Sequence, residues 1–323
     1  MLRGHASSSS SALSNATSDT LGAGSASLHP RAGGKEQPVS LARIVVPLVL
    51  LAMGLASVGK LPAFVVLSVP LVTMSAVFME GADASFNDMG DAFISGAFLA
   101  PPLLLVVEFV MALALAVALF GMEDTFDFLL SMDSKKSGSS HLADHLLVAL
   151  NEQDFKFVYL TCFSFFIAGL AEEVAKLCIS ATLCKNKQAS LLSSRRLLWT
   201  CGAVGLGLAF GESAVAVVSQ SGDGARSALE RVFTSHISHV ACAVLAGARL
   251  ASGKCAVSAL APSFAAHGFF DLLIILLALL AAPKWVSLLV SFMAALAVSH
   301  LAKTAVFALI EKEQISALQS NRV

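Results

Sequence analysis

The chain has 323 residues, of which 56% are hydrophobic and only 13% are charged. A soluble domain usually carries about 25% charged residues, so this composition excludes a soluble globular protein and a disordered protein. The formal net charge of −1 also argues against a nucleic-acid partner, because such a partner calls for a basic surface. We therefore expect an integral, multi-pass membrane protein of the all-α class, built as a polytopic transmembrane helical bundle.

Residues 1–40 differ from the rest of the chain, because they are rich in serine, glycine and alanine and lack apolar periodicity. Such a segment cannot bury enough apolar surface to offset the entropy lost on ordering, so we predict a disordered tail. Its few basic residues and its scarcity of acids resemble an organelle transit peptide, and an ordinary cytosolic tail is the simpler interpretation.

From residue 41 onward the apolar runs are long enough to cross a bilayer, which takes about 20 helical residues. Pro101-Pro102 predicts a kink or a partly re-entrant segment in the third run. We expect about eight spans, near residues 41–59, 61–79, 92–121, 157–184, 197–219, 232–250, 255–281 and 285–309. The chain then divides into a tail, the first helices with a polar loop, a catalytic four-helix core, and the last helix with a short C-terminal tail, at residues 1–40, 41–156, 157–281 and 282–323.

Lysine and arginine residues predict the orientation of the spans. The loop at 185–196 carries four of them, and the loop around 251–254 is flanked by Arg249 and Lys254. Under the positive-inside rule both loops are cytosolic, as are both chain termini. The acidic segment 80–91 falls on the same side, and the polar loop 122–156 falls on the other. The lipid bilayer is therefore a partner of the protein, and the sequence does not specify which organelle's membrane it is.

Ionisable residues are concentrated in the fourth to seventh predicted spans. A charged residue at mid-membrane costs about 2.5–3.5 kcal/mol on insertion scales, so these residues cannot all face lipid. We expect them to converge inside the bundle, paired or lining a wet cavity. They are Glu172, Glu173, Lys176, Glu212, His236, His239, His267 and Asp271.

The spacing of these residues predicts which of them meet. Glu172 and Lys176 lie four residues apart, as do His267 and Asp271, so each pair shares one helix face. The run GAVGLGLAFGE before Glu212 is rich in glycine, which permits close helix packing. We expect this packing to bring Glu212 towards the fourth span. The six cysteines form no CxxC pair and are interpreted as small apolar residues.

Four segments in order, AEEVAK, VGLGLAFGES, RVFTSHISHVACAVLAG and FAAHGFFD, resemble the PrsW family of intramembrane proteases. That family belongs with the CAAX prenyl endopeptidases and the bacteriocin-processing membrane proteases. Its pattern is EExxK, then FxxxE, then a histidine, then HxxxD or HxxxN, on four consecutive helices. The resemblance covers roughly residues 160–280, and Leu208 stands where the family has phenylalanine.

The resemblance implies an endopeptidase that hydrolyses peptide bonds of membrane-associated substrates. Glu172, with help from Glu173, would activate a water molecule, and His239 would position that water. His267, oriented by Asp271, would stabilise the oxyanion. Glu212 would hold an imidazole or share a proton. The implied catalytic residues are therefore Glu172, Glu173, Glu212, His239, His267 and Asp271.

Other functions fit the same residues. A mechanism without a cofactor is favoured, and a zinc-dependent mechanism is the alternative. Zinc would be bound by His239, His267, Glu172 and Glu212. The chain has no HExxH motif, so the spacing of these residues does not specify a zinc site. An ion- or proton-coupled transporter also buries acids and histidines, and a catalytically silent scaffold would share the fold. The substrate is either a transmembrane or a lipidated polypeptide, and the oligomeric state is not specified.

Overall fold

The computed structural model describes residues 48–49, 51–53, 59–81, 86–123, 125, 156–185, 194–219 and 224–320. Throughout these residues every regular element is a helix, as the all-α class predicts. The predicted disordered tail, most of the first predicted span and most of the polar loop 122–156 lie outside the described residues.

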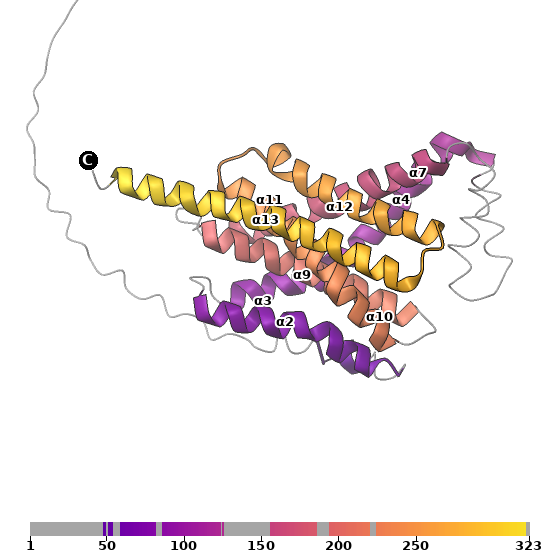
Figure 1. The fold of residues 1–323 in the computed structure, drawn as a ribbon, viewed down its shortest axis with the longest axis horizontal. Helices are drawn as coiled ribbons and strands as arrows, with labels where there is room; N and C mark the ends of the chain where they lie inside the picture. Colours follow the sequence, from indigo (N-terminus) through magenta and orange to yellow (C-terminus); the bar gives the residue numbers. More distant parts are fainter. Residues whose placement is uncertain are drawn as a thin grey trace, which may run out of the picture. The chain divides into compact units, whose positions relative to one another are not determined.

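Figure 1 shows how the α-helices are arranged. Three π-helical segments, named η in the text, lie among the described helices along the chain. A π-helical segment has i→i+5 hydrogen bonds and therefore wider turns than an α-helix. The elements are α2 (Leu61–Gly81), α3 (Phe86–Ile94), η1 (Ser95–Leu99), α4 (Ala100–Phe120), α7 (Lys156–Cys162), η2 (Phe163–Leu170), α8 (Ala171–Lys185), α9 (Ser194–Ser219), α10 (Gly224–Arg231), η4 (Val232–His236), α11 (Ile237–Ala251), α12 (Ala256–Leu279) and α13 (Lys284–Ser320).

Five helical stretches in this part of the chain are long and apolar enough to cross a membrane, as a membrane protein requires. Each coincides closely with a predicted span. The apolar part of α2, Leu61–Thr73, is shorter, and the helix around α11 is not among the five, so the count of eight stays a prediction. The five are Asp88–Phe120, Phe157–Cys184, Ser194–Ser219, Ala256–Leu279 and Lys284–Gln319.

The predicted interruption at Pro101-Pro102 takes the form of a π-helical segment. Neither proline can donate a backbone hydrogen bond to the preceding turn, and η1 ends immediately before this turn, at Leu99. The wider turn lets α3, η1 and α4 continue as one helix. The helix is therefore locally widened and does not fold back as a re-entrant segment.

Helix α9 lies at the centre of the bundle. Of its most apolar stretch, 78% is buried, against 39% or less in the other four candidate spans. A Cβ atom on Gly205 would lie 2.7 Å from the carbonyl oxygen of His239, and one on Gly207 would overlap the carbonyl oxygen of Phe93. The closest approaches of this glycine-rich helix are therefore to α11 and to the α3–η1 helix, and the expected approach to the fourth span is not the tightest one.

One end of the bundle is basic, and we define it by Arg196, Arg249 and Lys312. Arg196, in the first turns of α9, forms an ion pair with Asp88 of α3. Lys312 of α13 donates a hydrogen bond to the carbonyl oxygen of Ser252, 2.7 Å away. The start of α3 and the start of α9 therefore lie at the same end, as the sequence predicts.

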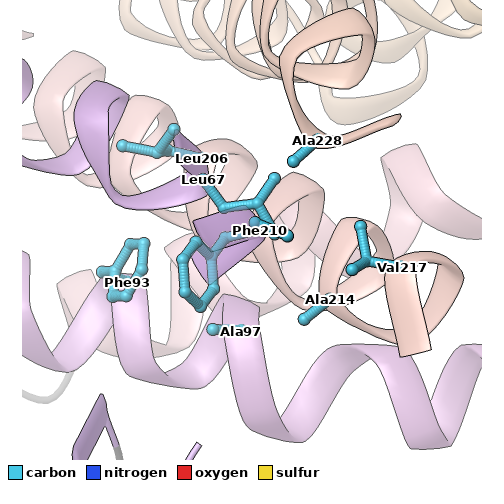
Figure 2. Close-up of a cluster of buried hydrophobic side chains, with 9 residues drawn as sticks. Leu67, Phe93, Ala97, Leu206, Phe210, Ala214, Val217 and Ala228 are labelled. Carbon is cyan, nitrogen blue, oxygen red and sulfur yellow. The ribbon is translucent and has the colours of Figure 1, made fainter. Parts of the chain in front are cut away.

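A cluster of apolar side chains joins α2, α3 and η1 to α9 (Figure 2). Phe210 is fully buried at its centre, with its ring centroid 5.5 Å from that of Phe93 and 6.1 Å from that of Phe64. Edge and tilted ring contacts of this kind stabilise a core beyond simple area burial. This cluster fixes the N-terminal helices on the face of α9 that carries Gly207 and Gly211.

A second close crossing joins the fourth and seventh predicted spans. A Cβ atom on Gly169 of η2 would lie 3.0 Å from the backbone nitrogen of Gly268 in α12, and one on Gly268 would lie 2.6 Å from the Phe165 ring. Small residues let two backbones approach within a membrane. Glu172 and His267 stand next to this crossing in the sequence, so the crossing sets how close they lie.

We predict that Gly207→Ala destabilises the bundle by about 1–3 kcal/mol, the usual effect of overpacking. The added methyl group would collide with the Phe93 carbonyl, which is backbone and cannot turn aside. The thermal midpoint of the purified protein in detergent measures the loss. Val215→Leu adds a methylene on the exposed face of the same helix and serves as the control. Equal midpoints for both variants would contradict the tight crossing.

Candidate functional site

The structure brings all six predicted site residues together with Lys176. Helix α8 supplies Glu172, Glu173 and Lys176, and α12 supplies His267 and Asp271. His239 comes from α11 and Glu212 from α9. The site residues of α8 and α11 come shortly after a π-helical segment, since η2 ends two residues before Glu172 and η4 ends three residues before His239. Segments of this kind often occur at functional sites.

The inner part of the cluster is a network around Glu173. Its Oε1 atom lies 2.6 Å from Nζ of Lys176 and 2.8 Å from Nδ1 of His267. The side chains of all three residues are 2% exposed or less. A buried carboxylate of this kind requires an opposite charge and hydrogen-bond donors. The lysine and the imidazole supply both, so Glu173 fixes the rotation of the His267 ring.

The outer part of the cluster is arranged around Glu172. Its Oε2 atom lies 3.2 Å from Nδ1 of His239 and 3.5 Å from both Nε2 of His267 and Nζ of Lys176. The two imidazole rings meet edge to face, with centroids 4.9 Å apart. One carboxylate oxygen therefore faces two histidines from two helices, and neither this oxygen nor Nδ1 of His239 makes a hydrogen bond to the described residues.

Two further carboxylates border this arrangement. Oε2 of Glu212 lies 3.3 Å from Nε2 of His239, and Oδ2 of Asp271 lies 3.5 Å from Nε2 of His267. Their side chains are 28% and 24% exposed, whereas that of Glu172 is 9% exposed. The site is therefore layered, with Glu173 and Lys176 innermost, Glu172 and the histidines next, and these two carboxylates outermost.

The cluster holds more negative than positive side chains. Lys176 is its one obligate cation among the described residues, and four carboxylates surround it and the two histidines. An uncompensated charge in a low-dielectric interior is strongly unfavourable. The cluster must therefore bind protons or a cation, and groups that exchange protons easily are what hydrolysis requires.

A cavity of about 750 Å³ reaches the outer layer from the end of the bundle opposite the basic end. Its inner wall contains Glu172, Glu212, His239, His267 and Asp271. Its outer wall is formed by α10, by η4 and by the first turns of α13, and carries both charged and hydroxyl side chains. The outer-wall residues include Arg226, Ser227, Glu230, Arg231, Thr234, Ser235, Lys284, Ser287 and Ser291. Water therefore has space to reach the two histidines.

An apolar groove of about 570 Å³ adjoins this cavity between α10 and α13. The two share Arg226, Glu230 and Leu288 in their linings. Phe233 and Trp285 line the groove and are 48% and 70% exposed. The groove presents an apolar surface to the surroundings of the bundle next to the polar cavity, so a partly apolar ligand could contact both.

Two groups of potential metal ligands occur in the described residues. The first is Glu172, His239 and His267, whose ligand atoms all lie within 4.8 Å of one another. Two imidazoles and a carboxylate are a donor set that catalytic zinc uses, so the residues fit zinc, the alternative to a metal-free site. Glu212, the fourth predicted ligand, lies outside this group. The ammonium of Lys176, 3.5 Å from Glu172, already supplies a positive charge there.

The second group is Glu173, Cys242 and His267. Cys242 is fully buried, as expected for a small apolar residue. Its sulfur nevertheless faces the cluster, because Cys242 stands one helical turn after His239 on the same helix. That spacing of three residues was the signal that could have found it.

His236 does not join the cluster. Its Nδ1 atom lies 3.2 Å from the carbonyl oxygen of Arg231, and its side chain lines a separate apolar cavity of about 820 Å³ between α2, α11 and α13. The choice of His239 over His236 as the site residue therefore agrees with the geometry.

Comparisons with protein-family models, with curated proteins and with solved structures find no match for this chain. The fold and the geometry of the cluster are therefore the basis for inferring its function.

We predict that Lys176→Met destabilises the protein by about 3–5 kcal/mol, because it leaves Glu173 buried without its cation. Adding Glu173→Gln to this variant should restore part of the loss, since the uncompensated charge disappears. Thermal midpoints in detergent of the wild type, both single variants and the double variant give the coupling between the two positions. Additive effects would show that the 2.6 Å contact contributes little to stability.

Proposed function

We propose that this protein is a multi-pass intramembrane endopeptidase of the PrsW type, acting on membrane-associated polypeptides. The observation that carries the proposal is the position of Glu172, whose Oε2 atom faces two imidazoles at the inner wall of a cavity between candidate membrane spans. The apolar groove beside the cavity supports a substrate that arrives from the membrane. Both a transmembrane and a lipidated polypeptide fit this description.

In the proposed reaction Glu172 is the general base. Its Oε2 atom and Nδ1 of His239 lie 3.2 Å apart without a hydrogen bond, so a water molecule beside them would find both an acceptor and an orienting group. Glu172 removes a proton from this water, and the hydroxide attacks the carbonyl carbon of the substrate. Glu212, 3.3 Å from the other nitrogen of His239, keeps that ring in position.

His267 stabilises the oxyanion in this proposal. Nδ1 of His267 donates a hydrogen bond to Glu173, and in the protonated ring Nε2–H points towards the outer layer of the site. That proton is available to the carbonyl oxygen as its negative charge develops. Glu173 therefore takes the orienting role that the resemblance assigns to Asp271, because its contact with the ring is 2.8 Å, against 3.5 Å for Asp271.

The tetrahedral intermediate then collapses with cleavage of the carbon–nitrogen bond. Glu172, which now carries the proton taken from water, donates it to the departing nitrogen. The products are a carboxylic acid and an amine, and Glu172 returns to its ionised form. Asp271 and Glu212, at the border of the cavity, connect the site to bulk water for proton exchange.

The zinc-dependent version of the same protease is the second candidate, because Glu172, His239 and His267 form a group with the donor set of a catalytic metal site. A bound zinc ion would make a coordinated water acidic and polarise the substrate carbonyl. In that version Glu172 would be a ligand, and Glu212 would be the nearest carboxylate to His239 available as a base.

We predict that Glu172→Gln and His267→Ala each lower the cleavage rate by 100-fold or more, the range expected for loss of a general base or an oxyanion donor. The assay follows cleavage of model transmembrane peptides by the full chain in proteoliposomes. His300→Ala removes an exposed histidine on α13 and should keep full activity. A folded wild type that cleaves no peptide while binding or transporting ions would favour the scaffold or transporter interpretation.

We also predict that cleavage survives exhaustive treatment with a zinc chelator. Lys176 already compensates part of the negative charge that a metal would otherwise neutralise. The measurement compares rates before chelation, after chelation and after adding zinc back, with metal content determined in parallel. Activity that disappears with zinc and returns with it would establish the metal-dependent version.

A further inference from the structure

The outer wall of the cavity has more positive than negative side chains. Arg226, Arg231 and Lys284 line it together with a single acid, Glu230. Glu230 accepts a hydrogen bond from Arg226 at 3.0 Å on the exposed surface of α10, so its charge is already balanced. The two remaining cations therefore give the outer wall a positive charge, directly beyond the acidic cluster of the inner wall.

Arg231 is the more deeply placed of these two cations. It is half-buried, whereas Lys284 is exposed. Within the described residues its guanidinium makes no hydrogen bond and no ion pair, although it lines the same cavity as Glu212 and His239. A guanidinium carries five hydrogen-bond donors in a planar fork. Glu212 attracts its charge across the cavity, and its donors are open to water or to a ligand that enters there.

Compensation of a helix end does not explain this arginine. Basic residues often stabilise the C-terminal end of a helix through its dipole, and Arg231 is the last residue of α10. However, α10 continues without a break through η4 into α11, because Arg231 itself has helical backbone angles of φ −67° and ψ −35°. There is thus no helix end for its charge to compensate.

We propose that Arg231 binds a carboxylate of the polypeptide substrate close to the scissile bond. A carboxylate matches the guanidinium fork with two parallel hydrogen bonds. One cavity of about 750 Å³ is lined both by Arg231 and by the proposed catalytic residues. The carboxylate therefore belongs to the scissile residues or to a residue near them in the substrate, as a side chain or a chain terminus.

The opposite charges of the two walls suit this arrangement. A peptide acid is repelled by Glu172, Glu212 and Asp271 at the inner wall and attracted by Arg231 at the outer wall. The substrate backbone is then held with its neutral carbonyl group at the catalytic residues and its charge away from them. A lipid phosphate would satisfy the same fork, but Arg231 is half-buried, whereas Lys284, which lines the same cavity, is exposed and better placed for a lipid headgroup.

This inference rests on the proposed peptidase function, and binding and cleavage are measured separately to keep the two apart. The probe is an apolar model peptide in which a single Asp is moved through successive positions, with matched peptides that carry Asn or Lys at each position. Fluorescence anisotropy gives its affinity for the full chain in nanodiscs, with Glu172→Gln present to prevent cleavage. Mass spectrometry of products from the unmodified active site gives kcat/KM and the position of the cut.

We expect the Asp peptide to bind about tenfold more tightly than the Asn peptide when the acid lies near the cut, with the difference mainly in KM. Arg231→Gln should abolish this preference, and Arg231→Glu should transfer it to the Lys peptide, a gain that misfolding cannot produce. Arg195→Gln makes the same charge change on an exposed residue at the basic end and should leave the preference unchanged.

Equal binding of Asp and Asn peptides at every position would overturn the inference and leave the peptidase proposal intact. Selective binding of the Asp peptide without any cleavage would support the inference and count against the peptidase. Repeating the binding with anionic and with neutral nanodisc lipids gives the remaining outcome. An effect of Arg231→Gln that depends on lipid charge and not on peptide charge would overturn the inference in favour of a lipid headgroup.

Discussion

The buried contact of Glu173 with Lys176 and His267 is the interaction on which the rest of the site depends. Carboxylates inside candidate membrane spans are tolerable only when opposite charge and hydrogen-bond donors reach them. At 2.6 Å and 2.8 Å, these two partners supply both to Glu173. Because the ion pair lies within one helix and the imidazole comes from another, the same contact fixes the crossing of α8 and α12. Glu172, one residue away, is thereby directed at the histidines.

Close helix crossings give this contact its geometry. Gly169 and Gly268 allow the helix that contains α8 to approach α12, and Gly205 allows α9 to approach α11 at His239. Two π-helical segments, η2 and η4, precede Glu172 and His239. One additional residue in a turn rotates the following side chains by about 100° around the helix axis. Packing and local winding together direct acids and histidines from four helices at one point.

The layered order of the cluster gives its residues different chemical roles. Glu173 and Lys176 have almost no exposed surface and hold the geometry. Glu172 and the two histidines face the cavity and can act on a water molecule, while the more exposed carboxylates exchange protons with solvent. Beyond them the cavity wall changes sign at Arg231, so in the proposed peptidase the substrate is recognised at one wall and cut at the other. An apolar groove adjoins both, consistent with a substrate that comes from the membrane.

The sequence by itself determined the helical class, most of the long apolar helices and the identity of the clustered residues. The clustered residues were predictable for a physical reason, because acids and histidines within apolar runs must converge to avoid contact with lipid. Only the tertiary structure decided which groups touch. In the structure the His267 ring lies closer to Glu173 than to Asp271, although Asp271 has the favourable i, i+4 spacing. The reason is that the glycine crossing brings α8 near to that ring. The tertiary structure also placed Arg231 in the wall of the cavity, which depends on the winding of η4 and on interhelical packing, and neither hydropathy nor spacing along one helix encodes these.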